Sequence, residues 1–234
     1  MKADFTTQWR NRRSVVMVLL VPVILLVSWR SLIDKFGAAF TLSNALTYGL
    51  IAIGLMGYSN SIARDRDKGV FQRLRVAPLP TWAIMLSRLT VQLAMIVLLT
   101  TVIFIVGYDY DKIVLPVQGY IFTYFTAVVG GAVYLSLGQV IVGLIKNPDT
   151  VNSTSRLVYF SFIIVGMFGG IGILGKQVEL FTQWSPYGTV KTLMAGGMVH
   201  NGWTMDTTYA LLATIGYIII FAGIGIQKFK WDTK

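Results

Sequence analysis

One segment in the second half of the chain has the spacing of a nucleotide-binding motif. Gly170, Gly175 and Lys176 match the glycine and lysine positions of a phosphate-binding P-loop. A P-loop continues with serine or threonine, which holds Mg²⁺, and Gln177 stands in that place. A P-loop also follows a buried strand, whereas this segment follows a long apolar stretch. The sequence therefore predicts no nucleotide site here. Gly166 and Gly170 instead have the GxxxG spacing that lets two helices approach closely.

A short charged segment, residues 64–79, lies between two long apolar stretches. Acidic and basic residues alternate before Gly69, and apolar and polar side chains then interleave up to a pair of prolines. Phe71, Leu74 and Arg75 fall at positions i, i+3 and i+4, which predicts one or two helical turns with an apolar edge. The prolines end that helix before the next apolar stretch. Two interpretations stay open: a rigid knob that docks into a groove on a cytoplasmic partner, or a solvated basic loop.

Several other kinds of chemistry are excluded or disfavoured. The chain has no cysteine, which excludes disulfides, thiol catalysis and thiolate metal sites. His200 is the one histidine, and the sequence around it offers no partner ligands, so we expect no metal site. The long apolar stretches contain no Asp, Glu, Lys, Arg or His. Proton-coupled and voltage-driven proteins generally need such groups at membrane depth, so energy for any transport is expected to come from another protein.

The polar side chains within the apolar stretches are uncharged. Tyr, Asn, Gln and Ser in membrane helices mostly form interhelical hydrogen bonds. Aromatic and methionine side chains could also line an adaptable apolar path, with packing in the core or against lipid as the alternative for each. The candidates for such a path are Tyr58, Asn60, Tyr159, Phe160, Phe162, Met167 and Phe168.

Composition predicts an all-α integral membrane protein. Of 234 residues, 55% are hydrophobic and only 13% are charged, which is too apolar for a soluble domain of this size. We expect six transmembrane helices, although the first is short and contains Pro22. Their apolar stretches are Ser14–Trp29, Phe36–Ala63, Leu89–Tyr108, Ile113–Ile145, Leu157–Gly175 and Thr207–Gln227. The fourth exceeds the length that one bilayer needs, so it could be one tilted helix or a span with an extension, and its core is expected near Val117–Gly138.

The distribution of basic residues predicts the orientation in the membrane. With the N-terminus inside, 15 of the 20 lysines and arginines lie on the cytoplasmic side. The remainder are Arg30, Lys35, Lys112, Lys176 and Lys191. The acidic residues divide equally, so the formal charge of +10 lies on the cytoplasmic half and both termini are expected inside. The basic composition thus reflects topology, and no nucleic-acid partner is expected.

Two flanking segments are expected to be helical. Residues 1–13 mix aromatic and basic side chains, which suits an amphipathic helix in the inner headgroup layer that forms an interfacial elbow. It could contact a cytoplasmic partner or merely flank the first span. Residues 176–206 show apolar side chains at helical spacing and predict a re-entrant or interfacial helical segment on the outer side, before the sixth span. It could cap a pathway or form an aromatic belt. Residues 1–234 therefore form one membrane domain.

The charged segment, within residues 64–82, resembles the signature of the ABC-2-type transporter permeases. In that family a charged stretch with a glycine follows the second span and leads through a short helix to proline. The matching positions are Asp65, Arg66, Asp67, Lys68, Gly69, Phe71, Gln72, Arg73, Leu74, Pro78 and Leu79. Lys146-Asn147-Pro148 after the fourth span and Ser185-Pro186-Tyr187 before the sixth also agree. The residue types differ from the family pattern at three places. Glutamates are usual around the glycine, whereas this chain has Asp67 before it and Gln72 after it, and Val70 stands where threonine is common.

The resemblance implies a non-catalytic transmembrane subunit of an ABC exporter. Its partners would be two cytoplasmic ABC ATPase subunits, a second permease copy or a paralogue, and membrane lipids. ATP and Mg²⁺ would bind to the ATPase partner and no cofactor to this chain. By similarity, 64–82 would be the coupling loop. Its ATPase-docking residues would be Asp65, Arg66, Asp67, Lys68, Gly69, Phe71, Gln72, Arg73, Leu74 and Arg75.

The expected cargo is a lipophilic or amphiphilic molecule, such as a drug, antibiotic or lipid-like compound, exported across a bacterial-type plasma membrane. Resistance to multiple drugs would be one consequence. The absence of charge inside the spans favours such a cargo over a small ion. Export of polysaccharide or glycolipid is the alternative. A carrier or channel that works without ATP is less favoured, because no carboxylate lies within a predicted span.

Overall fold

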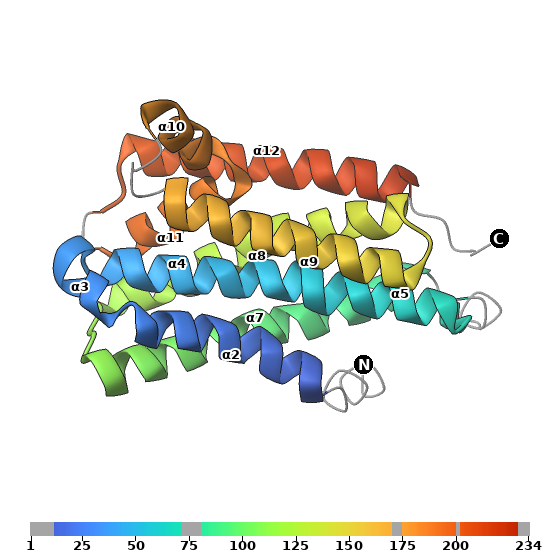
Figure 1. The fold of residues 1–234 in the computed structure, drawn as a ribbon, viewed down its shortest axis with the longest axis horizontal. Coiled ribbons are helices and arrows are strands. Elements are labelled where there is room, and N and C mark those ends of the chain that lie inside the picture. Colours follow the sequence, from blue (N-terminus) through green and yellow to red (C-terminus); the bar gives the residue numbers. More distant parts are fainter. Residues whose placement is uncertain (1–11, 72–80, 170–174, 200–201, 229–234) are drawn as a thin grey trace.

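The computed structural model describes residues 12–71, 81–169, 175–199 and 202–228, and these residues form helices and connecting turns without a strand (Figure 1). The all-α prediction is confirmed. The elements are α2 (Arg12–Ser28), α3 (Arg30–Phe36), α4 (Ala38–Ile51), the π-helix η1 (Ala52–Ser59), α5 (Asn60–Asp67), α7 (Thr81–Asp111), α8 (Val117–Leu144), α9 (Pro148–Ile164), the π-helix η2 (Val165–Gly169), α10 (Lys176–Trp184), α11 (Pro186–Met198) and α12 (Met205–Lys228).

Within the described residues, 5 helical segments are long and apolar enough to cross a membrane. They are Ala38–Asp67, Ser87–Asp111, Val117–Leu144, Pro148–Gly169 and Met205–Lys228. The chain is therefore a multi-pass membrane protein. α2 has 17 residues, or about 25 Å of helix against a hydrocarbon core of about 30 Å. A sixth span formed by α2 stays a prediction.

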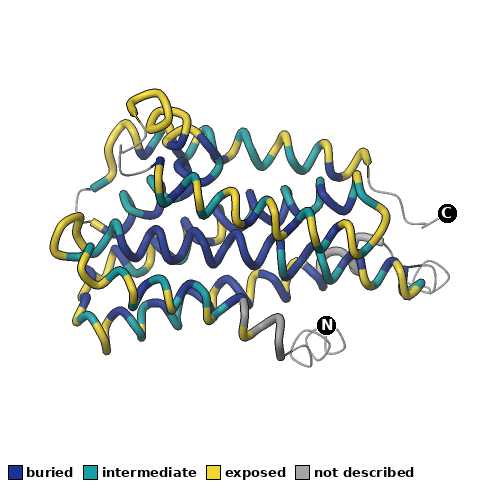
Figure 2. The backbone as a smooth tube through the Cα atoms, viewed as in Figure 1, coloured by how far each residue is buried: buried dark blue, intermediate teal, exposed yellow. Residues whose placement is uncertain are grey.

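The helices run side by side along the long axis, with the continuous helix α4–η1–α5 at the centre (Figure 1). Figure 2 shows this helix buried along most of its length, whereas α12 is largely exposed or half-buried. η1 packs closely against α8, because a β-carbon on Gly138 would meet the main chain of Gly54, and a β-carbon on Gly54 would meet the main chain of Tyr134. Glycines at such positions let two membrane helices approach closely.

Helix ends collect at two sides of the bundle. In Figure 1 the start of α2, the end of α5, the α8–α9 connection and the end of α12 lie at the right, and α3, the α7–α8 connection and α10 lie at the left. This arrangement suits the predicted topology, with the start of α2 and the end of α12 on one side. Which side faces the cytoplasm stays a prediction.

Two helices differ in extent from the apolar stretches that predicted them. α8 is one continuous helix that begins at Val117, the residue at which the core of the fourth span was expected to start. α9 begins at Pro148, well before the apolar stretch at Leu157. Asn147 caps α9, because its side-chain oxygen accepts hydrogen bonds from the amides of Asp149 and Thr150, and proline suits the first helical position.

The segment before the last helix forms two helices, as expected. α10 is mostly exposed, whereas α11 is buried against α4, α8 and α12 and contributes Tyr187, Val190, Leu193 and Met194 to the core. Whether this pair re-enters the membrane stays a prediction. Most of the predicted elbow, residues 1–13, lies outside the described residues, and α2 begins at Arg12.

Candidate coupling and substrate sites

The predicted coupling segment begins in α5 and turns back toward α7. After α5 ends at Asp67, Lys68 and Gly69 form a turn, in which Gly69 has a φ of 65° that glycine adopts without strain. Asp67 and Lys68 are exposed, whereas Arg66 and Phe71 are only 2% and 1% exposed. Four predicted docking residues, Gln72, Arg73, Leu74 and Arg75, lie outside the described residues. The accessible part of the described segment is therefore Arg64 and the turn at Asp67 and Lys68.

Arg66 binds the end of α8. Its Nη1 donates to the main-chain oxygen of Val142 at 2.7 Å, and its Nη2 donates to those of Ile145 and Lys146 at 2.6 and 2.9 Å. The last carbonyl groups of a helix lack intrahelical partners and carry partial negative charge, so a guanidinium is a favourable cap. This cap joins α5 to the C-terminal end of α8 without help from a carboxylate.

Asp65 and Phe71 both contact one arginine of α7. Arg88 Nη1 lies 2.7 Å from Asp65 Oδ2, and the centre of the Arg88 guanidinium lies 4.8 Å from the centroid of the Phe71 ring. Arg88 is 8% exposed, so the ion pair is shielded from water. A shielded charge pair with a cation–π contact holds its members more firmly than an exposed pair does.

The two arginines attach the coupling segment to two different helices. Arg66 reaches α8 and Arg88 fixes the segment to α7, while α5 itself continues into the central helix η1 and α4. A force applied at the Asp67–Lys68 turn would therefore move three helices rather than bend one free loop. Sequence analysis found these residue types but assigned Asp65, Arg66 and Phe71 to docking, and the structure turns their side chains toward the bundle.

The candidate substrate-path residues do not line one wall. Tyr58 points to α8, where its hydroxyl donates to Gln139 Oε1 at 2.7 Å. Asn60 points to α9, where its Nδ2 lies 3.5 Å from Asn152 Oδ1. The neighbouring Ser59 lies 2.8 Å from Ser155 of α9, between their hydroxyl oxygens. Tyr58 and Asn60 thus occupy different helix interfaces.

The α9 and η2 candidates also divide between the core and the surface. Tyr159 is 3% exposed, and its hydroxyl finds no hydrogen-bond partner among the described residues. Phe162 packs edge-on against Tyr134, with 6.1 Å between ring centroids. Phe160 and Phe168 are 56% and 46% exposed and face away from the bundle, and Met167 is half-buried. A path within one copy of the chain could involve Tyr159 but not all of these residues.

A buried aromatic cluster where α4, α11 and η2 meet was not predicted. Tyr48 and Tyr187 stack with 5.3 Å between ring centroids, and the Tyr187 hydroxyl donates to Asn44 Oδ1. Gly166 lies against the Tyr187 ring and the Tyr48 hydroxyl and leaves no room for a β-carbon. The GxxxG spacing indicated a close approach at Gly166, but the partner rings come from α4 and α11, far away in the sequence.

Comparison with known families identifies the chain as a transporter subunit. The model of the ABC-2 type transporter family matches residues 1–201. The chain belongs to the ABC-2 type transporter family. A comparison with curated proteins gave no match. The resemblance inferred from the charged segment is thereby confirmed for most of the chain's length.

Membership in the ABC-2 family indicates which role the described residues can serve. Permeases of this family are membrane transport subunits, and they work with ABC ATPase partners. Among the described residues, no group of three or more His, Asp or Glu side chains could hold a metal ion. The arrangement of this ABC-2 permease is suited to passing a mechanical displacement from its exposed turn into the bundle.

Proposed function

We propose that this ABC-2 permease is the transmembrane subunit of an ATP-driven exporter for lipophilic or amphiphilic molecules. The observation that carries the proposal is the attachment of the coupling segment. Arg66 joins α5 to the end of α8, and the Asp65–Arg88 pair joins it to α7. The Asp67–Lys68 turn is exposed between these anchors and offers charges of both signs to a partner.

In this proposal two cytoplasmic ATPase subunits bind and hydrolyse ATP with Mg²⁺. The permease pairs with a second copy or a paralogue in a bacterial-type plasma membrane, with both termini in the cytoplasm. The surface of α9 supports a partner in the membrane plane, because Leu157, Phe160 and Ile164 are more than half exposed. Closure of the ATPase pair would displace the coupling segments and, through their anchors, the helices that enclose the cargo.

The proposed cargo class rests on the chemistry of the seam between η1 and α9. Ser59, Asn60, Ser155 and Asn152 meet there through neutral hydroxyl and amide groups. Tyr159 adds a buried hydroxyl with no partner among the described residues. A seam with aromatic walls and a few neutral polar groups suits an amphiphile, since a buried ion would require charged or strongly polar partners.

The test is transport by the permease together with its cognate ATPase in inverted membrane vesicles. Vesicles that contain the wild-type complex should take up Nile red, an uncharged lipophilic dye, in the presence of ATP, and vanadate should stop this uptake. Charge reversal at the turn, Asp67→Lys with Lys68→Asp, should release the ATPase during purification and abolish uptake. Asp149→Lys, at another exposed acidic residue, is the matched control and should leave both unchanged.

Two results would contradict the proposal. Dye uptake by the permease alone, without ATPase or ATP, would indicate a carrier or channel. An ATPase complex that survives the charge reversal at Asp67 and Lys68 would show that docking does not use this turn.

A further inference from the structure

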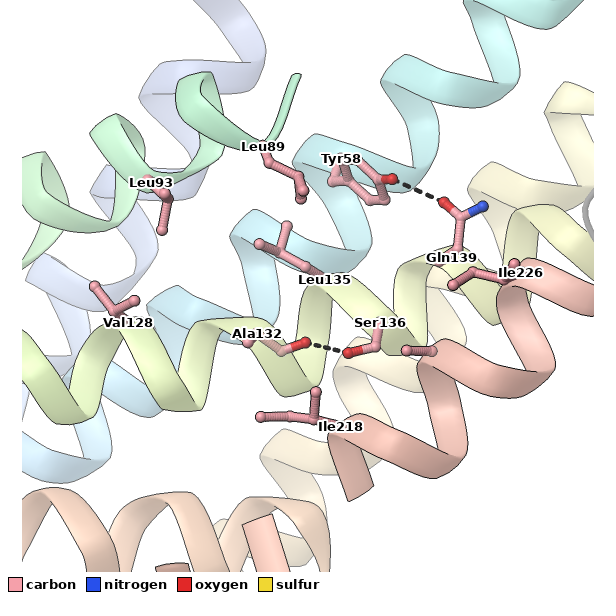
Figure 3. A pocket seen from close by; sticks show the side chains of 11 residues that line it. Tyr58, Leu89, Leu93, Val128, Ala132, Leu135, Ser136, Gln139, Ile218 and Ile226 are labelled. Carbon is pink, nitrogen blue, oxygen red and sulfur yellow. Dashed lines mark hydrogen bonds between the residues drawn. The ribbon is translucent and has the colours of Figure 1, made fainter. Parts of the chain in front are cut away.

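A pocket of about 580 Å³ opens between α7, α8 and α12, with Tyr58 of η1 in its wall (Figure 3). Its volume lies within the range of about 300–1,000 Å³ that is usual for small-molecule sites. Of the 11 described residues that line it, only Tyr58, Ser136 and Gln139 carry polar side chains. The pocket is separate from the seam between η1 and α9 and from the coupling segment.

Most of the polar groups in the wall are already satisfied. Ser136 donates to the main-chain oxygen of Ala132 in its own helix, and Tyr58 donates to Gln139 Oε1 (Figure 3). The Gln139 Nε2 group makes no hydrogen bond among the described residues. The pocket therefore offers a nearly apolar surface with one amide donor. Such a surface suits a hydrocarbon chain that carries a carbonyl group, since the carbonyl can accept from the amide.

The rim of the pocket is apolar and exposed. Leu89, Leu93 and Ile226 are 41%, 40% and 72% exposed. These residues belong to α7 and α12, two of the helices that are long and apolar enough to cross the membrane. An occupant can therefore enter sideways from the hydrocarbon region. The lining residues on α12 run from Ile218 to Ile226, about 12 Å of helix, which is close to the depth of one leaflet, about 15 Å.

One end of the pocket lies next to basic residues. Leu89 follows Arg88, whose guanidinium is paired with Asp65. On α12, Lys228 follows two residues after Ile226, and its Cβ lies near Gly143 of α8, one turn beyond Gln139. Lys228 is exposed, and no carboxylate of the described residues lies within ion-pair distance of it. Lys228 is thus an exposed cation close in sequence to this end of the apolar pocket, with no carboxylate partner among the described residues.

We propose that the pocket binds one acyl chain of an anionic phospholipid whose phosphate pairs with Lys228. A phospholipid supplies in one molecule the hydrocarbon chain, the ester carbonyl and the negative charge that the wall, Gln139 and Lys228 accommodate. The acyl chain would contact Tyr58 of η1, so the lipid would stabilise the Tyr58–Gln139 hydrogen bond that joins the central helix to α8. Bound lipid would then favour the arrangement in which the coupling segment is attached to α8.

The test measures lipid binding to the full-length chain by native mass spectrometry. Wild-type protein, delipidated in detergent, is titrated with phosphatidylglycerol and with phosphatidylcholine. One tightly bound phosphatidylglycerol is expected, with a preference of about fivefold over phosphatidylcholine, the effect of one lysine near an anionic headgroup. Lys228→Gln should abolish the preference while phosphatidylcholine binding stays unchanged. Lys146→Gln, an exposed lysine at the same end of the bundle, should retain the preference.

Filling the pocket should remove both lipids. Ala222→Trp and Ala132→Phe place large side chains in the lining and should weaken binding of either lipid by at least about tenfold, as expected when a well-packed site is blocked. Ile219→Trp adds the same bulk to an exposed position of α12 outside the pocket and should bind as wild type. Size-exclusion chromatography and circular dichroism identify any variant that fails to fold, and two filling variants at different helices guard against that outcome.

Three results would overturn the proposal. Unchanged phosphatidylglycerol binding in a folded pocket-filling variant would place the lipid elsewhere. An unchanged preference in Lys228→Gln would reject the anionic assignment. A disulfide-linked dimer of Leu93→Cys, formed on mild oxidation, would show that a second copy covers the pocket; the absence of native cysteines makes such a band unambiguous.

Discussion

Arg66 Nη1 donates to the main-chain oxygen of Val142 at 2.7 Å, although 76 residues separate them in the sequence. Together with the bonds to Ile145 and Lys146, this contact makes the guanidinium the cap of α8. The planar guanidinium can serve several carbonyl oxygens at once, which an ammonium on a flexible stem cannot do in the same geometry. The central helix and α8 are therefore fixed to each other at the end that carries the coupling segment.

Replacing Arg66 with methionine should destabilise the permease by about 1–3 kcal/mol, because three carbonyl oxygens lose a charged donor. Arg66→Lys should recover only part of this loss. Thermal unfolding of the full chain in lipid nanodiscs measures the effect. Lys68→Gln changes an exposed cation in the adjacent turn and should have little effect. An Arg66→Met variant as stable as wild type would mean that water replaces the guanidinium without cost.

The Asp65–Arg88 pair should show energetic coupling in a double-mutant cycle. Asp65→Ala and Arg88→Met each break the 2.7 Å contact, and each leaves a poorly solvated group behind. The double variant should therefore be less destabilised than the sum of the single variants, with a coupling of about 0.5–3 kcal/mol. Unfolding free energies of the four proteins give this quantity. If the two changes in unfolding free energy are additive, water screens this pair as it screens an exposed pair.

The coupling segment shows how far sequence reasoning reaches. Its position, charge pattern and family resemblance were visible in the sequence, because they depend on neighbouring residues. The inward orientation of Arg66 and Phe71 depends on the end of α8 and on Arg88 of α7, which only folding brings near. From sequence alone, a charged residue in a predicted loop is assigned to the surface unless its distant partner is known.

Gly166 should tolerate no larger side chain. A β-carbon there would meet the Tyr187 ring and the Tyr48 hydroxyl, so Gly166→Ala should destabilise the protein by about 1–3 kcal/mol through overpacking. Gly216 is the matched control, since it also lies in a helix but has nothing within 4 Å of the added atom. Gly216→Ala should be neutral or stabilising by up to about 1 kcal/mol. Equal effects of both changes on the unfolding temperature would contradict the packing argument.

Ser59 and Ser155 should form a disulfide when both are replaced with cysteine. Their hydroxyl oxygens are 2.8 Å apart, and the native chain contains no competing thiol. If transport requires α9 to move against η1, oxidation should stop ATP-driven dye uptake and reduction should restore it. Ser59→Cys with Ser161→Cys is the control, since Ser161 lies exposed on α9 and should not cross-link. Full transport by the cross-linked protein would place the moving seam elsewhere.

The helix boundaries illustrate a second limit of sequence reasoning. Hydropathy located the apolar parts of the spans, but α9 begins earlier, at a cap made by Asn147 with Pro148. The buried contacts of Tyr48 and Tyr187 also escaped prediction, because an interior tyrosine has many possible partners. Local capping signals were present in the sequence and could have extended α9; the tyrosine stack required the packing of α4 against α11.

Lys191 should make stability rise with pH above neutrality. It lies on α11 with Nζ 4.4 Å from the centroid of the Phe40 ring, and burial lowers its pKa from 10.5 to about 8. Between these values the unfolded chain binds more protons than the folded chain, so the free energy of unfolding increases with pH through that window.

Lys191→Met removes the buried charge, so its stability advantage over wild type should shrink as pH rises from 7 to 10, by an amount on the order of 2 kcal/mol. Unfolding temperatures of both proteins at constant ionic strength measure the difference, and Lys176→Met, at an exposed lysine, should run parallel to wild type. Parallel curves for Lys191→Met would show that Lys191 stays charged throughout this range, held by its contact with Phe40 or by water rather than neutralised by burial.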